Sequence, residues 1–90
     1  MAQEEVILRV KGSSNVASLA SVVAHGIYEN KSLSLRAIGA AAVNQAMKSI
    51  AIAQSYVGAR GLRILVIPGF TDVQMDDGTV TALLFRIKVE

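Results

Sequence analysis

The sequence predicts an α/β (α+β) fold, a two-layer sandwich of order β-α-β-α-β-β with a mixed four-stranded sheet and two helices on one face. The first observation is that the hydrophobic period switches between two and three-to-four along the chain. The second is that strand-helix-strand crossovers are right-handed, which places both helices on the same side of the sheet. The third is the length of 90 residues, which suits one core, so we expect a single domain over residues 1–90.

The first strand is expected from about Glu5 to Lys11, where apolar and polar residues alternate. A Gly-Ser-Ser-Asn segment, residues 12–15, then ends the strand, and Ser14 or Asn15 provides an N-cap. The following helix closes near residues 28–30. Its apolar stripe is formed by Val16, Leu19, Ala20, Val23 and Ile27.

The second strand and second helix meet at Gly39. Residues 33–38 alternate with period two, whereas the alanine-rich segment after Gly39 has the period of a helix. Its small side chains favour the helix and allow a close approach to the sheet. Gly58 or Gly61 is expected to end it. The predicted apolar stripe consists of Val43, Ala46, Met47, Ile50, Ala53 and Val57.

The last third of the chain predicts a hairpin. A long strand runs from Leu62 to about Gln74 and contains Pro68, which implies either a bulge or an edge position. An Asp-Asp-Gly segment at residues 76–78 supplies the turn, and residues 80–89 return as the final strand. The two phenylalanines occupy strand positions and are expected in the core: Phe70 and Phe85.

Two segments of the chain carry a family resemblance. GAAAVNQAMKSIAIA, residues 39–53, and VIPGFTDVQ, residues 66–74, resemble the stage V sporulation protein S family over nearly the whole chain. More distantly, Gly39 and the AVNQAM segment are similar to Alba, the archaeal chromatin protein. The resemblance implies an Alba-like fold and a bacterial regulatory protein of sporulation or cell development that binds DNA or RNA. Gln45 stands where Alba carries a positive charge, so we expect weak, largely sequence-independent binding.

The Alba resemblance also implies where nucleic acid would bind: the turn after the first strand, the start of the alanine-rich helix and the hairpin arm. Backbone amides at a helix start and small hydroxyls suit phosphate oxygens, and lysines add charge. The same turn is also an ordinary capped connection, and Asp76 and Asp77 would repel phosphate at the hairpin tip. The candidate nucleic-acid-binding residues are Lys11, Ser13, Ser14, Asn15, Asn44, Gln45 and Lys48.

A second candidate surface is the sheet face that the helices leave uncovered. Six basic residues oppose the apolar set of their strands and are expected there: Arg9, Lys11, Arg36, Arg63, Arg86 and Lys88. One interpretation is a basic binding face, and the other is that an open sheet simply needs polar residues toward water. Leu65, Ile67 and Leu84 have the same parity, so a second subunit could instead cover part of this face.

Composition bounds the functional classes. With 52% hydrophobic and 18% charged residues, the chain is apolar for its size, so we expect a homodimer or higher homo-oligomer. Neither a membrane-spanning run nor a signal peptide is evident, and there is no cysteine, which together predict a cytoplasmic protein without thiol chemistry.

Enzymatic function is not expected. The single histidine, His25, has no acid or nucleophile at a suitable spacing and is interpreted as a surface residue. No cofactor, metal or small-molecule substrate is predicted. The alternative to nucleic-acid binding is therefore a non-enzymatic, homo-oligomeric protein-interaction module that does not bind nucleic acid.

Overall fold

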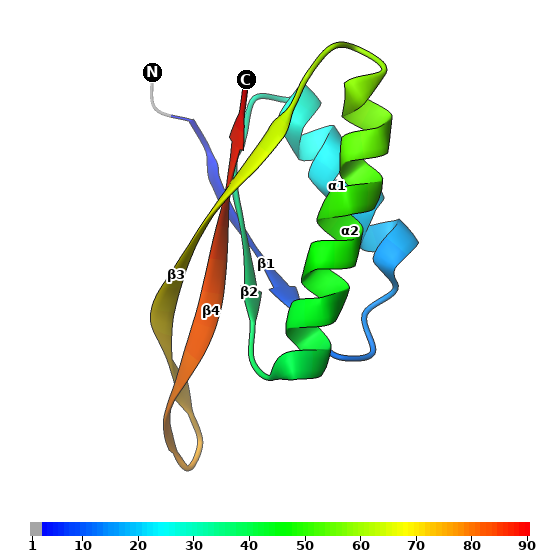
Figure 1. Ribbon diagram of the computed structural model, residues 1–90. Helices are drawn as coiled ribbons and strands as arrows, with labels where there is room; N and C mark the ends of the chain where they lie inside the picture. The colour runs from blue at the N-terminus through cyan, green and yellow to red at the C-terminus, as the bar shows by residue number, and fades with distance from the viewer. Residues whose placement is uncertain (1–2) are drawn as a thin grey trace.

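Six elements form two layers in the computed structural model, which describes residues 3–90. Figure 1 shows both helices on one face of the sheet, as the right-handed crossovers predict. The two-layer sandwich of order β-α-β-α-β-β is therefore confirmed. The elements are β1 (Glu5–Val10), α1 (Val16–Tyr28), β2 (Ser32–Ala37), α2 (Ala40–Gly58), β3 (Ile64–Met75) and β4 (Gly78–Val89).

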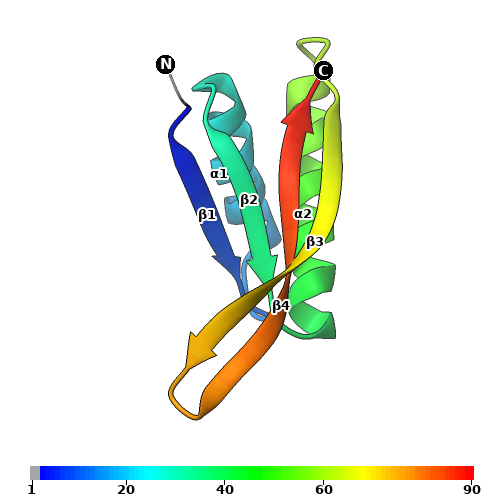
Figure 2. The same ribbon diagram turned by 90° about the vertical axis from the view of Figure 1, so that its left-hand side faces the viewer.

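The sheet is mixed, with the strand order β1-β2-β4-β3. β1 and β2 are parallel, while β4 pairs antiparallel with both β2 and β3. The β3–β4 register runs without interruption from Ile64 opposite Val89 to Met75 opposite Gly78. Pro68 therefore occupies an edge strand and not a bulge, which decides between the two predicted possibilities. Beyond the body of the sheet, the two strands continue as a twisted arm (Figure 2).

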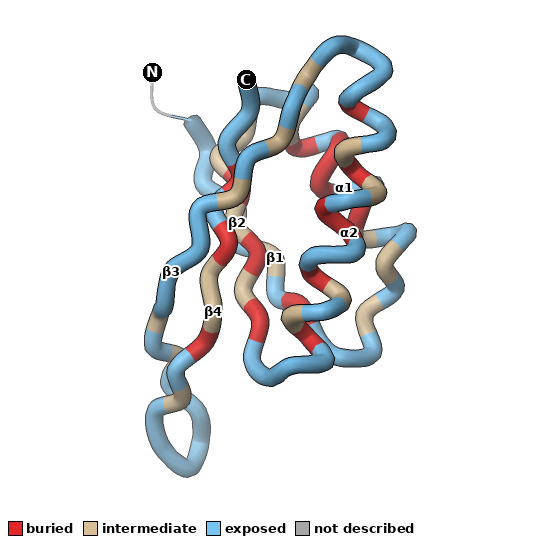
Figure 3. Tube along the Cα trace, in the orientation of Figure 1, coloured by how far each residue is buried: buried red, intermediate tan, exposed pale blue. Residues whose placement is uncertain are grey.

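The core lies between the sheet and the helices (Figure 3). Leu33 and Leu35 of β2 and Phe85 of β4 supply its large side chains from the sheet. The alanines of α2 at positions 42, 46 and 53 are almost fully buried, so the small side chains do bring this helix close to its neighbours. α1 contributes Ala20 and Val23. Burial on one sheet face and one stripe of each helix accounts for the two periods in the sequence.

Two residues predicted to be in the core are exposed. Phe70 is 79% exposed and lies on the edge strand β3, opposite Leu83 of β4. Met47 is 43% exposed, and Ser49 is fully buried instead. The hydroxyl of Ser49 is satisfied because it donates to the carbonyl oxygen of Ala46 at 2.7 Å. The stripe of α2 is thus rotated slightly from the predicted one.

The helix boundaries agree with the predicted capping chemistry. Asn15 caps α1, since its Oδ1 accepts a hydrogen bond from the backbone amide of Ser18 at 2.9 Å. Gly39 precedes α2 with a φ of 88°, a conformation that favours glycine. Lys11 follows β1 and Arg63 precedes β3, so neither belongs to a strand as predicted. No helix within residues 3–90 is long and apolar enough to span a membrane.

Candidate nucleic-acid interface

The β1–α1 turn packs against the start of α2. The side-chain amide Nε2 of Gln45 donates a hydrogen bond to the carbonyl oxygen of Ser14 at 2.9 Å. A β-carbon placed on Gly12 would lie 2.9 Å from the β-carbon of Ala41, so the two segments touch at a glycine. We call this region, residues 11–15 and 40–48, the helix-start end. The predicted residues of the first candidate set are all found here, as the Alba resemblance implies.

Both helices begin at the helix-start end. β1 and β2 are parallel, so their carboxyl ends, and the helices that follow them, lie at the same end of the sheet (Figure 1). Neither helix has an acidic residue in its first turn, and no side chain caps α2. The amino ends of helices carry partial positive charge. Backbone and side chains therefore contribute positive potential to the same region.

Several of the predicted binding groups are occupied within the fold. Ser14 Oγ accepts a hydrogen bond from the Lys11 backbone amide at 2.8 Å, and Asn15 is the helix cap described above. Asn44 donates to Gln45 Oε1 at 3.3 Å. The polar side chains of the turn thus chiefly hold its shape. The lysines differ: within residues 3–90, neither Lys11 nor Lys48 has an acidic group within ion-pair distance.

The second candidate set lies along the open sheet face, which Figure 2 views directly. Arg9 and Arg36 are opposite each other on β1 and β2. Arg86 of β4 lies opposite both Ser34 and Ile67. Exposed apolar side chains lie between these charges, including Ile7 and Ile67. The face is therefore mixed, with its basic residues interrupted by hydrophobic ones.

The opposite end of the molecule contains all the ion pairs among residues 3–90. Lys31 Nζ lies 3.3 Å from Glu4 and 3.5 Å from Glu29, and Arg63 pairs with Glu90. The hydrogen bond that Lys31 donates to Glu4, and secondly the negative charge of Glu29, raise the pKa of Lys31. We call this region, which contains the ion pairs of Lys31 and Arg63, the paired end. The charge of Arg63, a residue of the second candidate set, is thus neutralised by Glu90.

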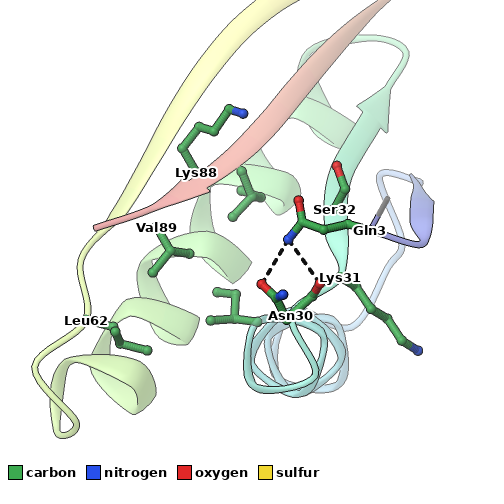
Figure 4. Close-up of a pocket in the computed structure, with 9 residues that line it drawn as sticks. Gln3, Asn30, Lys31, Ser32, Leu62, Lys88 and Val89 are labelled. Carbon is green, nitrogen blue, oxygen red and sulfur yellow. Dashed lines mark hydrogen bonds between the residues drawn. The ribbon is translucent and has the colours of Figure 1, made fainter. Parts of the chain in front are cut away.

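A cavity of about 400 Å³ opens at the paired end (Figure 4). Two of the residues that line it are joined by hydrogen bonds: Gln3 Nε2 donates to the carbonyl oxygen and to Oδ1 of Asn30, at 3.0 and 2.9 Å. Lys88 is the one residue of the two candidate sets that lines it. Within residues 3–90 there is no cluster of three His, Cys, Asp or Glu side chains suited to a metal, and His25 is exposed as predicted.

A groove that the sequence does not predict joins the two candidate surfaces. It contains Arg9 and Arg36 from the open face and Lys11 from the helix-start end. Its remaining wall comes from the hairpin arm, through Val73 and Met75. Strand parity places these two residues on the open side of the sheet, but only the twist of the arm brings them near the end of β1.

Comparison with known proteins places the chain in a family. The model of the stage V sporulation protein S family matches residues 6–90. Among solved structures, Alba from Thermoplasma volcanium is similar with a TM-score of 0.61 and 13% identity, covering 94% of this chain and 99% of that chain. At this identity the likeness establishes the fold alone, which is Alba-like. With 85 of its 90 residues matched, the chain belongs to the stage V sporulation protein S (SpoVS) family.

Proposed function

We propose that the protein is a non-enzymatic regulator of sporulation or cell development that binds nucleic acid, DNA or RNA, through its helix-start end. The observation that carries the proposal is the position of Lys11 in the turn before α1 and of Lys48 in the third turn of α2, both without acidic partners among residues 3–90. Unpaired cations beside free backbone amides suit a phosphate backbone. Family membership and the Alba-like fold are consistent with this role.

The geometry favours weak binding without sequence preference. The helix-start end offers lysines and amides, which contact phosphates, and it has no aromatic side chain on which a base could stack. Asp76 and Asp77 at the tip of the arm oppose phosphate. Non-specific complexes of this kind have dissociation constants of about 10⁻⁴ to 10⁻⁶ M at physiological salt.

A homodimer in the cytoplasm is part of the proposal. Phe70, on the edge strand β3, has most of its surface exposed, which is unusual for so large an apolar side chain. A second subunit that covered Phe70 would remove this surface from water. Dimerisation would also place two helix-start ends on one polymer, and such bivalency raises the apparent affinity.

The test is fluorescence-anisotropy binding of labelled duplex DNA and single-stranded RNA across a salt series. Wild type should bind at least one polymer, with affinity that falls steeply as salt rises. The Lys11→Ala/Lys48→Ala variant should weaken binding and reduce the salt slope by about two units per subunit on duplex DNA, because two phosphate contacts are lost.

The matched control is Lys31→Ala/Arg63→Ala, which removes the same charge from the paired end. It should bind nearly as wild type, because those cations are already neutralised by Glu4, Glu29 and Glu90. If neither polymer binds at low salt, the nucleic-acid proposal fails. The exposed apolar surface would then favour the alternative of a homo-oligomeric protein-interaction module.

A further inference from the structure

The groove between the arm and the sheet is a second candidate site, which shares Lys11 and Gly12 with the helix-start end but does not include Lys48 or Asn44. Its volume is about 380 Å³, within the range of small-ligand sites. Residues at the carboxyl ends of β1 and β2 line it together with residues of the twisted arm. The residues that line it are Arg9, Val10, Lys11, Gly12, Arg36, Ile38, Val73 and Met75.

The groove concentrates positive charge that the fold does not neutralise. Arg9 and Arg36 lie directly opposite each other on neighbouring strands, and Lys11 follows one residue beyond β1. Like charges in direct register destabilise a sheet. No acidic residue lines the groove, and none lies within ion-pair distance of these three cations among residues 3–90. A bound anion would turn this repulsion into attraction.

The remaining wall is apolar, which narrows the class of anion. Ile38 and Met75 are 40% and 45% exposed, and Val73 is half-buried beside them. A bare phosphate ion would contact the arginines and leave this surface exposed to water. A ligand with a phosphate and a flat, weakly polar body would use both parts, and arginine can also stack on such a body.

We propose that this groove binds a nucleoside phosphate. Arg9, Arg36 and Lys11 hold the phosphate, with the guanidinium groups placed to donate paired hydrogen bonds to its oxygens. The base lies against Ile38, Val73 and Met75. Two sources have this chemistry, a free nucleotide and a phosphorylated end of a single strand. The inference goes beyond polymer binding at the helix-start end, since it needs neither Lys48 nor the start of α2.

The first experiment is an NMR titration of ¹⁵N-labelled protein with AMP, and separately with adenosine and with inorganic phosphate. AMP should shift the amides of residues 9–12, 36–38 and 73–75 and bind more tightly than either fragment. No shift in these segments, or AMP binding no tighter than phosphate, would overturn the proposal.

Variants then assign the contacts. Arg36→Gln and Arg9→Gln should each weaken AMP binding about tenfold or more, the usual cost of removing a hydrogen bond between charged groups. Met75→Glu places a negative charge on the exposed arm wall and should weaken AMP binding without disturbing the sheet. Arg86→Gln, on the same face but outside the groove, is the matched control and should bind as wild type. Equal affinity in all four variants would contradict the assignment.

A competition experiment distinguishes the two possible ligands, a free nucleotide and a phosphorylated strand end. A 5′-phosphorylated tetranucleotide that competes with AMP, and loses its binding in Arg36→Gln, would support the strand end as ligand. AMP binding without such competition would support the free nucleotide. Binding of duplex DNA and of single-stranded RNA is measured on the same samples. If either polymer binds but AMP causes no shift, the groove proposal alone is overturned. If AMP binds but neither polymer does, the proposed function alone is overturned.

Discussion

The two ends of this small domain treat charge in opposite ways. At the paired end, Lys31 and Arg63 are each held by carboxylates, so their positive charge is neutralised within the chain, while Lys88 beside the cavity has no acidic partner among residues 3–90. At the helix-start end and the adjoining groove, Lys11, Lys48, Arg9 and Arg36 have no such partner among residues 3–90. A net charge of +2 therefore conceals a polarised molecule.

This difference shows why overall charge is a weak guide to binding. Surface ion pairs add little stability, so the acids at the paired end are not needed to hold the fold together. They do restrict the region in which an anion is attracted. Binding should follow the distribution of unpaired cations and not their total number.

The largest effect is expected from Phe70→Ser, which would disrupt the proposed dimer and so separate its two helix-start ends. Removing the exposed ring should convert a dimer into a monomer in light scattering and lower polymer affinity by about tenfold or more through lost bivalency. Because Phe70 is exposed in the subunit, the fold itself should be retained in circular dichroism. Val22→Ser, also exposed but outside the helix-start end, is the control. A dimer that survives Phe70→Ser would contradict this interface.

Two tightly packed glycines, one toward each end of the molecule, can separate a local effect on binding from a general loss of stability. A β-carbon on Gly12 would lie 2.9 Å from that of Ala41, and one on Gly26 would lie 2.7 Å from Leu33 Cδ1. Gly12→Ala and Gly26→Ala should each lower the free energy of unfolding by about 1–3 kcal/mol through overpacking, measured by urea denaturation.

Only one of these variants should change binding. Gly12→Ala pushes the β1–α1 turn away from α2 and should weaken polymer affinity in the anisotropy assay. Gly26→Ala strains the α1–β2 contact and should leave affinity unchanged under conditions where the protein stays folded. Equal affinity losses in both would mean that general stability, and not the shape of the helix-start end, controls binding.

A smaller effect is expected from Gln45→Ala. This change removes the hydrogen bond to the Ser14 carbonyl and should cost about 0.5–1.5 kcal/mol in thermal unfolding. Polymer affinity should fall modestly because the turn is less fixed. Asn44→Ala is the neighbouring control, and its long 3.3 Å contact predicts a smaller loss of stability. A larger loss in Asn44→Ala would contradict the role given to Gln45.

The smallest effect concerns the pKa of Lys31. Glu4 and Glu29 raise this pKa above its ordinary value of 10.5, so the folded state binds the proton more tightly than the unfolded state. The resulting stabilisation is complete below pH 10.5 and disappears as pH rises through the raised pKa. The melting temperature of wild type should exceed that of Lys31→Gln slightly at neutral pH, with the gap closing in strongly alkaline buffer. A gap that widens with pH would contradict this assignment.

Local patterns predicted most of the fold. The alternation in residues 33–38, the N-cap at Asn15 and the edge position of Pro68 each depend on a rule that acts over a few residues, and each is confirmed. The exposure of Phe70, on the edge strand β3, depends on packing between elements, which strand parity does not describe.

The candidate site was predictable only in part. The sequence, with the Alba resemblance, brings the β1–α1 turn and the start of α2 together, and Gln45 and Gly12 make that contact. It predicts the capping role of Asn15 but does not reveal the internal hydrogen bonds of Ser14 and Gln45, because their partners are settled by side-chain geometry. The groove also escapes prediction, since it depends on the twist of the arm.

The most direct test of the central claim is an NMR footprint of a short duplex DNA on ¹⁵N-labelled protein at low salt. Shifts are expected in the amides of residues 11–15 and 40–48, with little change around Lys31 and Arg63. Shifts concentrated at the paired end, or spread evenly over the surface, would contradict the claim that unpaired cations at the helix starts direct binding.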